Sequence, residues 1–143
     1  MVDGLSVKAR SRLMARVGQR DTAPELALRK GLHRLGLRFR VNVSGLPGRP
    51  DLVFPKYRVA LFVHGCFWHA HSCRAGRLPT SNVDYWFDKL RANTRRDRLR
   101  AAALRRLGWR VWTVWECELK CPVDADRTLV RLGRKFERIS AAD

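Results

Sequence analysis

His64-Gly-Cys-Phe-Trp-His-Ala-His-Ser-Cys73 is the stretch of sequence around which the rest of the chain is organised. It begins at the end of an apolar run that predicts a β-strand, and it holds three histidines, two cysteines and two large aromatic residues. Imidazoles and thiolates at such close spacing are typical of metal ligation or proton transfer. We therefore expect the functional centre of the protein at the end of this strand.

The composition indicates a globular protein that binds a polyanion. The chain has 143 residues, of which 45% are hydrophobic and 30% are charged, which suits one domain with a hydrophobic core. Its net charge is +17 and its basic residues are spread along the whole sequence, so nucleic acid is the expected partner. No apolar run has transmembrane length and no signal peptide is recognisable. The protein is expected in the cytoplasm, associated with the nucleoid when it is bound to DNA, and not at a membrane.

The cysteines predict a zinc site rather than disulfides. Cys66, His71 and Cys73 lie close together, and Cys117 follows a second expected strand, so it can complete a tetrahedral Cys₃His set. A closed set of four protein ligands is typical of structural Zn²⁺. Cys121 is left as a spare thiol or as an alternative fourth ligand. The competing interpretation is that the thiols are small buried hydrophobic groups without a metal.

The pattern of apolar, capping and turn residues predicts an α/β fold with a single domain over residues 21–143. Thr22-Ala-Pro-Glu25 matches a capping box, and leucines follow at helical spacing up to Gly36. The segment 1–20 is basic, and we expect it to contact DNA. The later expected elements are strands over 37–43, 51–54 and 58–63, a long basic helix over 82–107, a strand over 109–115, and a closing helix from about 124 to 136.

Asp51 is the first candidate for a catalytic metal ligand. It follows Leu46-Pro-Gly-Arg-Pro50 and enters a strand that is followed at once by another strand. Nuclease cores that bind Mg²⁺ through carboxylates have a similar arrangement. A lone aspartate after proline is more often a turn residue, so the interpretation depends on two histidines, His64 and His69, that remain once zinc takes His71.

Several motifs, in order, resemble those of the very short patch repair endonucleases. They are Leu46-Pro-Gly-Arg-Pro-Asp51, His64-Gly-Cys-Phe-Trp-His69 with His71 and Cys73, Gly108-Trp-Arg-Val111, and Val114-Trp-Glu-Cys117. The resemblance runs from about residue 10 to beyond residue 118. It implies a restriction-endonuclease-like α/β fold, with a mixed central sheet flanked by helices and a structural zinc site. It also implies Mg²⁺-dependent nicking of DNA at a T:G mismatch, which arises by deamination of 5-methylcytosine, on the 5′ side of the mismatched thymine.

The resemblance assigns roles to individual residues. Asp51 and the backbone carbonyl of Val63 match contacts to catalytic Mg²⁺, and His69 matches the base that activates the attacking water. His64 and Glu25 match residues that support the metal-bound waters. The capping box explains Glu25 equally well. A histidine base, in place of the lysine common in restriction nucleases, predicts that nicking falls as the pH drops through the histidine pKa.

The resemblance also implies which residues touch DNA. Phe67, Trp68 and Trp86 match aromatic residues that wedge into the base stack beside the mismatch, where pairing is already defective and unstacking costs least. The residues that match readers of base edges are Lys89 and Asn93, with help from Met14 in the N-terminal segment. The competing interpretation of Lys89 and Asn93 is a solvated helix face.

Four further residues are interpreted from the sequence alone. Asp97, on the long helix, is a candidate to orient a catalytic histidine through a hydrogen bond, with a surface ion pair as the alternative. Trp109, Trp112 and Trp115 alternate along the last expected strand, and we expect them to pack in the core.

Two other functions remain open. A related restriction endonuclease that acts on modified or unmodified DNA would use the same metal site. A non-catalytic zinc-containing DNA-binding module would need the basic surface and the zinc, but the presence of both Asp51 and His69 disfavours it. Family analogy suggests a mismatch-repair matchmaker protein and a cytosine-5 methyltransferase system as partners, and the protein is expected to be a monomer.

Overall fold

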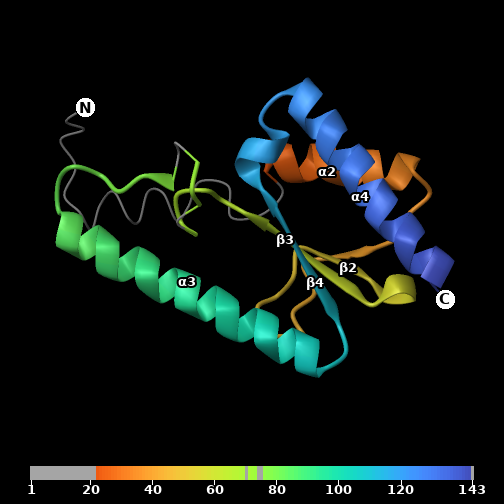
Figure 1. Ribbon diagram of the computed structural model, residues 1–143, viewed down its shortest axis with the longest axis horizontal. Helices are drawn as coiled ribbons and strands as arrows, with labels where there is room; N and C mark the ends of the chain where they lie inside the picture. Colours follow the sequence, from red (N-terminus) through yellow and green to blue (C-terminus); the bar gives the residue numbers. More distant parts are fainter. Residues whose placement is uncertain (1–21, 70, 74–75, 143) are drawn as a thin grey trace.

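The computed structural model describes residues 22–69, 71–73 and 76–142 and has a mixed α/β fold. Figure 1 shows the sheet between the long helix α3 on one side and helices α2 and α4 on the other. The expected order of helices and strands is confirmed, while the segment 1–20, with Met14, lies outside the described residues. The elements are α2 (Ala23–Arg34), β1 (Arg40–Val41), β2 (Leu52–Phe54), the 3₁₀ helix η1 (Pro55–Tyr57), β3 (Val59–His64), α3 (Val83–Arg106), β4 (Arg110–Trp115), the 3₁₀ helix η3 (Glu116–Leu119) and α4 (Pro122–Ala142).

Helix α2 begins and ends where its capping residues predict. The Thr22 hydroxyl accepts a hydrogen bond from the Glu25 amide at 3.3 Å, and Pro24 lies in the first turn, where a missing N–H removes no helical bond. Gly36 follows the helix with a φ of +86°, a left-handed conformation that favours glycine. The leucines at helical spacing are buried except Leu35, which is exposed because it lies at the C-cap, past the last turn.

The sheet is mixed, as predicted. Its order over the described residues is β1-β2-β3-β4, with antiparallel pairs from β1 to β3 and a parallel pair between β3 and β4. A parallel pair needs a crossover connection, and α3 supplies it. Side chains alternate along β3, so Val59 and Leu61 pack with α2 and α4, whereas Ala60 and Phe62 pack with Leu104 of α3. Each face of the sheet is therefore covered by helix, and side chains in register with Phe62 face α3.

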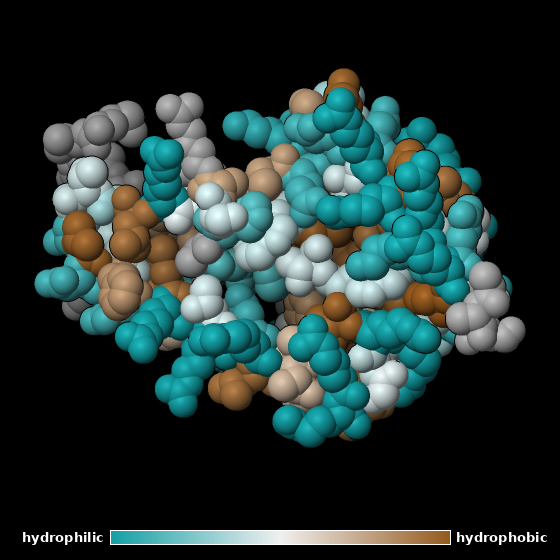
Figure 2. All heavy atoms as spheres, viewed as in Figure 1, coloured by the Kyte–Doolittle hydropathy of each residue, from teal (hydrophilic) through white to brown (hydrophobic). Residues whose placement is uncertain are grey.

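Helix α3 has more apolar residues than it buries. It begins after Asn82 and ends before Leu107, close to the predicted bounds. Its buried residues are Trp86, Leu90 and Leu104, whereas Val83, Phe87 and Leu99 of the same periodic pattern are exposed. Figure 2 shows apolar side chains in small groups among hydrophilic ones on one face of the molecule. The periodicity thus predicts the helix but overestimates the part of its surface that the protein covers.

Two elements differ in length from the prediction. β1 spans only Arg40–Val41 because Asn42 has a φ of +49°, a left-handed conformation that ends the strand. α4 begins at Pro122, a residue favoured in the first turn of a helix, and extends beyond the predicted end. Among the residues that the structure describes, no helix is long and apolar enough to cross a membrane.

Candidate active site and metal centre

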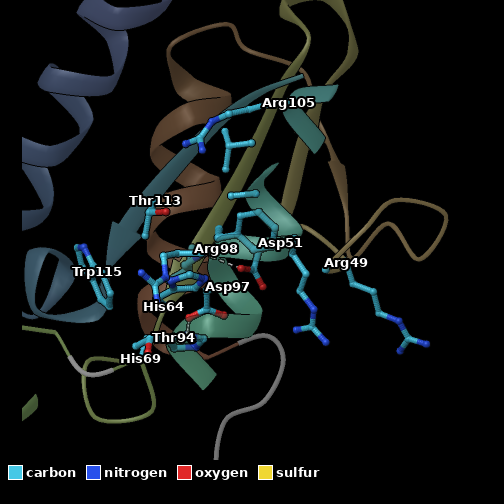
Figure 3. Close-up of a pocket in the computed structure, with 16 residues that line it drawn as sticks. Arg49, Asp51, His64, His69, Thr94, Asp97, Arg98, Arg105, Thr113 and Trp115 are labelled. Atoms are coloured by element: carbon cyan, nitrogen blue, oxygen red, sulfur yellow. Dashed lines mark hydrogen bonds and ion pairs between the residues drawn. The ribbon is translucent and has the colours of Figure 1, made fainter. Parts of the chain in front are cut away.

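The alternation of side chains brings the predicted catalytic residues to the α3 face of the sheet. His64 follows Phe62 by two positions on β3, and their ring centroids lie 5.5 Å apart. Asp51 precedes β2, which is antiparallel to β3, so it lies at the same end of the sheet as His64. His69 comes from the loop after β3, and Asp97 comes from α3. Four of the five predicted catalytic residues line one cleft, which is shown in Figure 3, whereas Glu25 does not line it.

The Asp51 carboxylate is held at the backbone of β3. Its Oδ2 accepts a hydrogen bond from the Val63 amide at 2.6 Å. Burial raises the pKa of Asp51 above its usual value, although the Val63 amide and the nearby Arg29 guanidinium oppose the shift. A buried carboxylate whose pKa is raised by its surroundings gains from a bound cation, because the cation restores the ionised form.

His64 and His69 form a stacked pair of imidazoles. Their ring centroids lie 3.8 Å apart and the ring planes differ by only 4°. Burial lowers the pKa of His64 to about 4, and the charge of a protonated His69 adds to the effect. His64 is therefore neutral at neutral pH, so the stack avoids two positive charges in contact.

Asp97 fixes the tautomer of His69. Nδ1 of His69 lies 2.5 Å from Oδ2 of Asp97. Burial alone raises the pKa of Asp97, but the hydrogen bond and the charge of His69 outweigh it, so this pKa lies below its usual value. An ionised carboxylate only accepts hydrogen bonds, so Nδ1 carries the ring proton and Nε2 of His69 keeps a lone pair. The predicted orienting contact of Asp97 with a histidine is thus present in the structure.

Glu25 is buried and is connected to the active site only indirectly, by way of Arg29. Its Oε2 accepts a hydrogen bond from Nη2 of Arg29 at 3.3 Å, and only 6% of Glu25 is exposed. The Glu25 amide donates to the Thr22 hydroxyl, so the N-cap half of the predicted capping box is present, while the printed contact of the Glu25 side chain is with Arg29. Because Arg29 acts electrostatically on Asp51, the buried carboxylate of Glu25 is tied to the active-site aspartate through one guanidinium.

The four predicted zinc ligands come together in a second cluster, separate from the catalytic residues. One donor atom from each of Cys66, His71, Cys73 and Cys117 lies within 4.8 Å of the others. Sγ of Cys117 is 3.6 Å from Nδ1 of His71, which matches the spacing of about 3.5 Å between a sulfur and a nitrogen on one tetrahedral Zn²⁺. Burial raises the pKa of Cys66 and, together with the Cys66 thiol, raises that of Cys117 to about 12. Four crowded soft donors of this kind fit a cation that stabilises thiolates. Cys121 is exposed and donates a hydrogen bond to a carboxylate instead.

Trp115 connects the two clusters, a role that the sequence did not indicate. Its ring stacks on His71 at 4.1 Å between centroids, with 21° between the planes. Its ring also meets His64 at 5.4 Å and His69 at 6.4 Å, in both cases edge to face. Alternation is the signal that was available: Trp115 differs by an odd number of positions from Trp112, which packs on the opposite face of the sheet. The prediction that all three strand tryptophans are core residues is therefore wrong for Trp115.

The predicted DNA-binding aromatics form a cluster of their own. The rings of Phe67, Trp68 and Trp86 lie 5.2 to 6.0 Å apart between centroids. Phe67 and Trp68 are half-buried, whereas Trp86 is 1% exposed and lies under them. Asn93 donates a hydrogen bond from Nδ2 to the Trp68 carbonyl at 3.0 Å, so it supports the loop that carries the aromatics. Lys89 is exposed on α3.

Comparisons with known proteins identify the family of this chain. The family model described as DNA mismatch endonuclease Vsr matches residues 2–75. The chain is 54% identical, over 83% of its length and 88% of the relative's, to a protein of Xanthomonas oryzae pv. oryzae named Type II nicking enzyme V.XorIIP. It is 39% identical, over 96% of its length and 98% of the relative's, to the Type II nicking enzyme V.NmeAIP of Neisseria meningitidis. It is 44% identical, over 84% of its length and 77% of the relative's, to the DNA mismatch endonuclease Vsr of Escherichia coli. The chain therefore belongs to the Vsr family of DNA mismatch endonucleases and is a strand-nicking endonuclease.

Proposed function

We propose that this endonuclease recognises a T:G mismatch that arises from deamination of 5-methylcytosine and nicks the strand 5′ to the mismatched thymine, using Mg²⁺, to start very short patch repair. The observation that carries the proposal is the pairing of a backbone-held carboxylate, Asp51, with a histidine whose tautomer is fixed by Asp97. Phosphodiester hydrolysis needs a cation at the phosphate and a base at the water, and one cleft brings both kinds of group together. The proposal includes a restriction-endonuclease-like core over residues 21–143, with segment 1–20 in contact with DNA.

Each catalytic residue has a distinct role in the proposed reaction. Asp51 and the Val63 carbonyl would hold Mg²⁺, which would supply positive charge to neutralise the scissile phosphate. Nε2 of His69 takes a proton from water as the water oxygen bonds to phosphorus and the bond to the leaving sugar oxygen breaks. Asp97 stabilises the imidazolium that forms. His64 supports the metal-bound water while it stays neutral.

Glu25 and the zinc ligands support the site from two sides. Glu25 acts on the metal-bound waters and fixes Arg29 beside Asp51. We propose that Cys66, His71, Cys73 and Cys117 bind a structural Zn²⁺, because their four clustered donor atoms would fill all positions of a tetrahedral cation. The ion would then order the loop between the two clusters.

The aromatic cluster is the proposed reader of the mismatch. Phe67 and Trp68 have exposed surface and can enter the base stack directly, while the buried Trp86 joins them only when the cluster opens on DNA. A mismatched pair is easier to unstack than a paired one, so wedging selects it. Lys89 and Asn93, with Met14, then contact base edges.

Replacing Trp68 with alanine should lower nicking of a T:G duplex by about tenfold or more, because one base step would lose its stacking partner. Binding to a fully paired duplex should change much less, since the basic surface dominates it. We would measure both at two salt concentrations. The control is Phe87→Ala, an exposed aromatic on α3 outside the cluster. Equal losses on mismatched and paired duplexes would assign Trp68 to the core rather than to recognition.

A panel of duplexes tests the proposed function as a whole. The duplexes carry T:G, C:G, 5-methylcytosine:G or other mismatches in varied flanking sequences, and the nick is mapped to one strand and one phosphate. We expect nicking 5′ to the thymine of T:G alone. Cleavage of paired duplexes, modified or not, would identify a Vsr-like restriction endonuclease instead. Added matchmaker protein would show whether the proposed mismatch-repair partner changes the rate, and gel filtration would test for a monomer.

A further inference from the structure

The active-site cleft is larger than the chemistry at Asp51 needs. Its volume is about 660 Å³, a size typical of sites that hold a whole small molecule. It extends from the catalytic cluster along α3 and the edge strand β4. Besides the catalytic residues, its charged lining consists of four arginines, Arg49, Arg98, Arg100 and Arg105.

One face of α3 lines this cleft along its length. Thr94, Asp97, Ala101 and Arg105 are spaced three or four positions apart, so they share a side of the helix. Arg105 therefore lies about 12 Å beyond Asp97 along the helix axis, at 1.5 Å per residue. Ala101 stands between them, and its small side chain leaves the cleft open from the acid to the arginine.

Strand β4 lines the cleft opposite α3 and contributes one hydroxyl group, that of Thr113. Val111, Thr113 and Trp115 alternate on the α3 face of β4, and all three line the cleft. Trp115 lies at the catalytic end, beside His64, and Thr113 lies toward Arg105, as Figure 3 shows. Thr113 is exposed although it is in the middle of a strand that faces a helix. On the side of Trp115 away from the catalytic residues, the cleft thus offers the Thr113 hydroxyl and, beyond it, the Arg105 guanidinium, both accessible to solvent.

The carboxylates of the cleft lie at its catalytic end, whereas its arginines extend along the rest of it. Among the residues that the structure describes, the guanidinium groups of Arg98, Arg100 and Arg105 make no hydrogen bond or ion pair, although the charge of Arg100 acts on Asp97. The carboxylates of the cleft, Asp51 and Asp97, both lie at the catalytic end, and Asp97 is bound to His69. The Arg105 guanidinium therefore has no carboxylate partner, and a guanidinium that shares a cleft with a hydroxyl group is suited to a phosphate.

We propose that Arg105 and Thr113 form a second phosphate subsite, which binds a backbone phosphate of the nicked strand a few nucleotides from the scissile phosphate at Asp51. A DNA strand carries one phosphate per 3.4 Å of axis, so the distance of about 12 Å from Asp97 to Arg105 spans several nucleotides. Binding there fixes the register of the strand, which sets which phosphate reaches Asp51. The inference rests on the proposed function only in placing the scissile phosphate at Asp51.

Neutral phosphates locate the subsite. In a series of duplexes, one phosphate of the nicked strand at a time is replaced by an uncharged methylphosphonate, and binding is measured without Mg²⁺. For the wild type, we expect a methylphosphonate at a single position, distant from the scissile phosphate, to weaken binding about tenfold. This is the loss expected when one charged hydrogen bond is removed. Arg105→Gln should weaken binding to unmodified DNA by a similar factor, and should be insensitive to methylphosphonate at that position. For this variant, the slope of the logarithm of the binding constant against the logarithm of the salt concentration should become less steep, by about the amount that one phosphate contact contributes.

Arg106→Gln is the matched control, since Arg106 is exposed on the same helix but does not line the cleft. It should keep the wild-type methylphosphonate profile. Thr113→Val, which keeps the size of the side chain, should weaken binding less and leave the salt dependence unchanged. Equal effects of Arg105→Gln and Arg106→Gln, or additive effects of Arg105→Gln and every methylphosphonate, would overturn the subsite. Binding is measured on both T:G and paired duplexes and does not require cleavage. The subsite can therefore be confirmed or rejected even if the protein does not nick at T:G mismatches.

Discussion

Replacing Asp51 with asparagine should lower the single-turnover rate of nicking at least about a hundredfold while the protein stays folded and still binds DNA. The amide oxygen of asparagine can still accept the hydrogen bond from the Val63 amide, which Asp51 accepts at 2.6 Å, so the local backbone is kept. What is lost is the negative charge that holds the catalytic cation. Since burial raises the pKa of Asp51, removing this buried charge should not lower the melting temperature. Stability and activity are thus expected to move independently.

His69→Ala should have a similar effect on rate for a different reason. It removes the proposed proton acceptor, and a general base contributes typically about 10²- to 10⁴-fold to the rate. His33→Ala is the matched control, because His33 is an exposed histidine on α2, outside the cleft. Single-turnover nicking of a T:G duplex, with binding measured in parallel, separates chemistry from affinity. Near-wild-type nicking by either Asp51→Asn or His69→Ala, in the presence of Mg²⁺, would place the active site elsewhere.

Sequence patterns predicted the order of the helices and strands and most of the side chains that the structure gathers at the candidate site. Thr22, Gly36 and the glycine at 108 act through local backbone preferences, which do not depend on the rest of the fold. The cluster of candidate metal ligands was also recognisable, because cysteines and histidines at such close spacing are typical of metal sites. The structure brings the four expected zinc ligands into one cluster and four of the five expected catalytic residues into one cleft, which Glu25 does not line.

What the sequence did not predict is set by contacts between distant elements. The apolar spacing of α3 is the same at Phe87, which is exposed, and at Leu90, which is 3% exposed, since only the path of the loop and sheet decides which is covered. Trp115 looked like its neighbours on the strand until the sheet showed which face it occupies. The open cleft at Ala101 and Arg105 likewise depends on how far α3 lies from β4, a distance that no local pattern encodes.

Removing Zn²⁺ should have the largest effect on stability. We expect the purified protein to hold one Zn²⁺, and a strong chelator to lower its melting temperature by more than about 10 °C, because the free energy of binding structural zinc contributes directly to folding. Without the cation, the thiols of the buried Cys66 and the half-buried Cys117 return to protonated forms that the raised pKa of each favours. His71 is then no longer fixed by the cation, so Trp115 loses the fixed ring on which it stacks. Because Trp115 also contacts His64 and His69, the position of both catalytic histidines becomes less defined. Nicking should therefore fall along with stability.

Two cysteine variants separate the zinc site from the effect of losing any thiol. Cys73→Ser removes one donor of the cluster and should reproduce the chelated state, with less than one zinc per chain by elemental analysis. Cys121→Ser should keep zinc, stability and nicking, because the Cys121 thiol is exposed and lies outside the cluster. A protein that is folded and free of zinc, with the same melting temperature before and after chelation, would contradict the structural-zinc assignment. A loss of zinc in Cys121→Ser, with zinc retained in Cys73→Ser, would instead make Cys121 the fourth ligand through a rearrangement of η3.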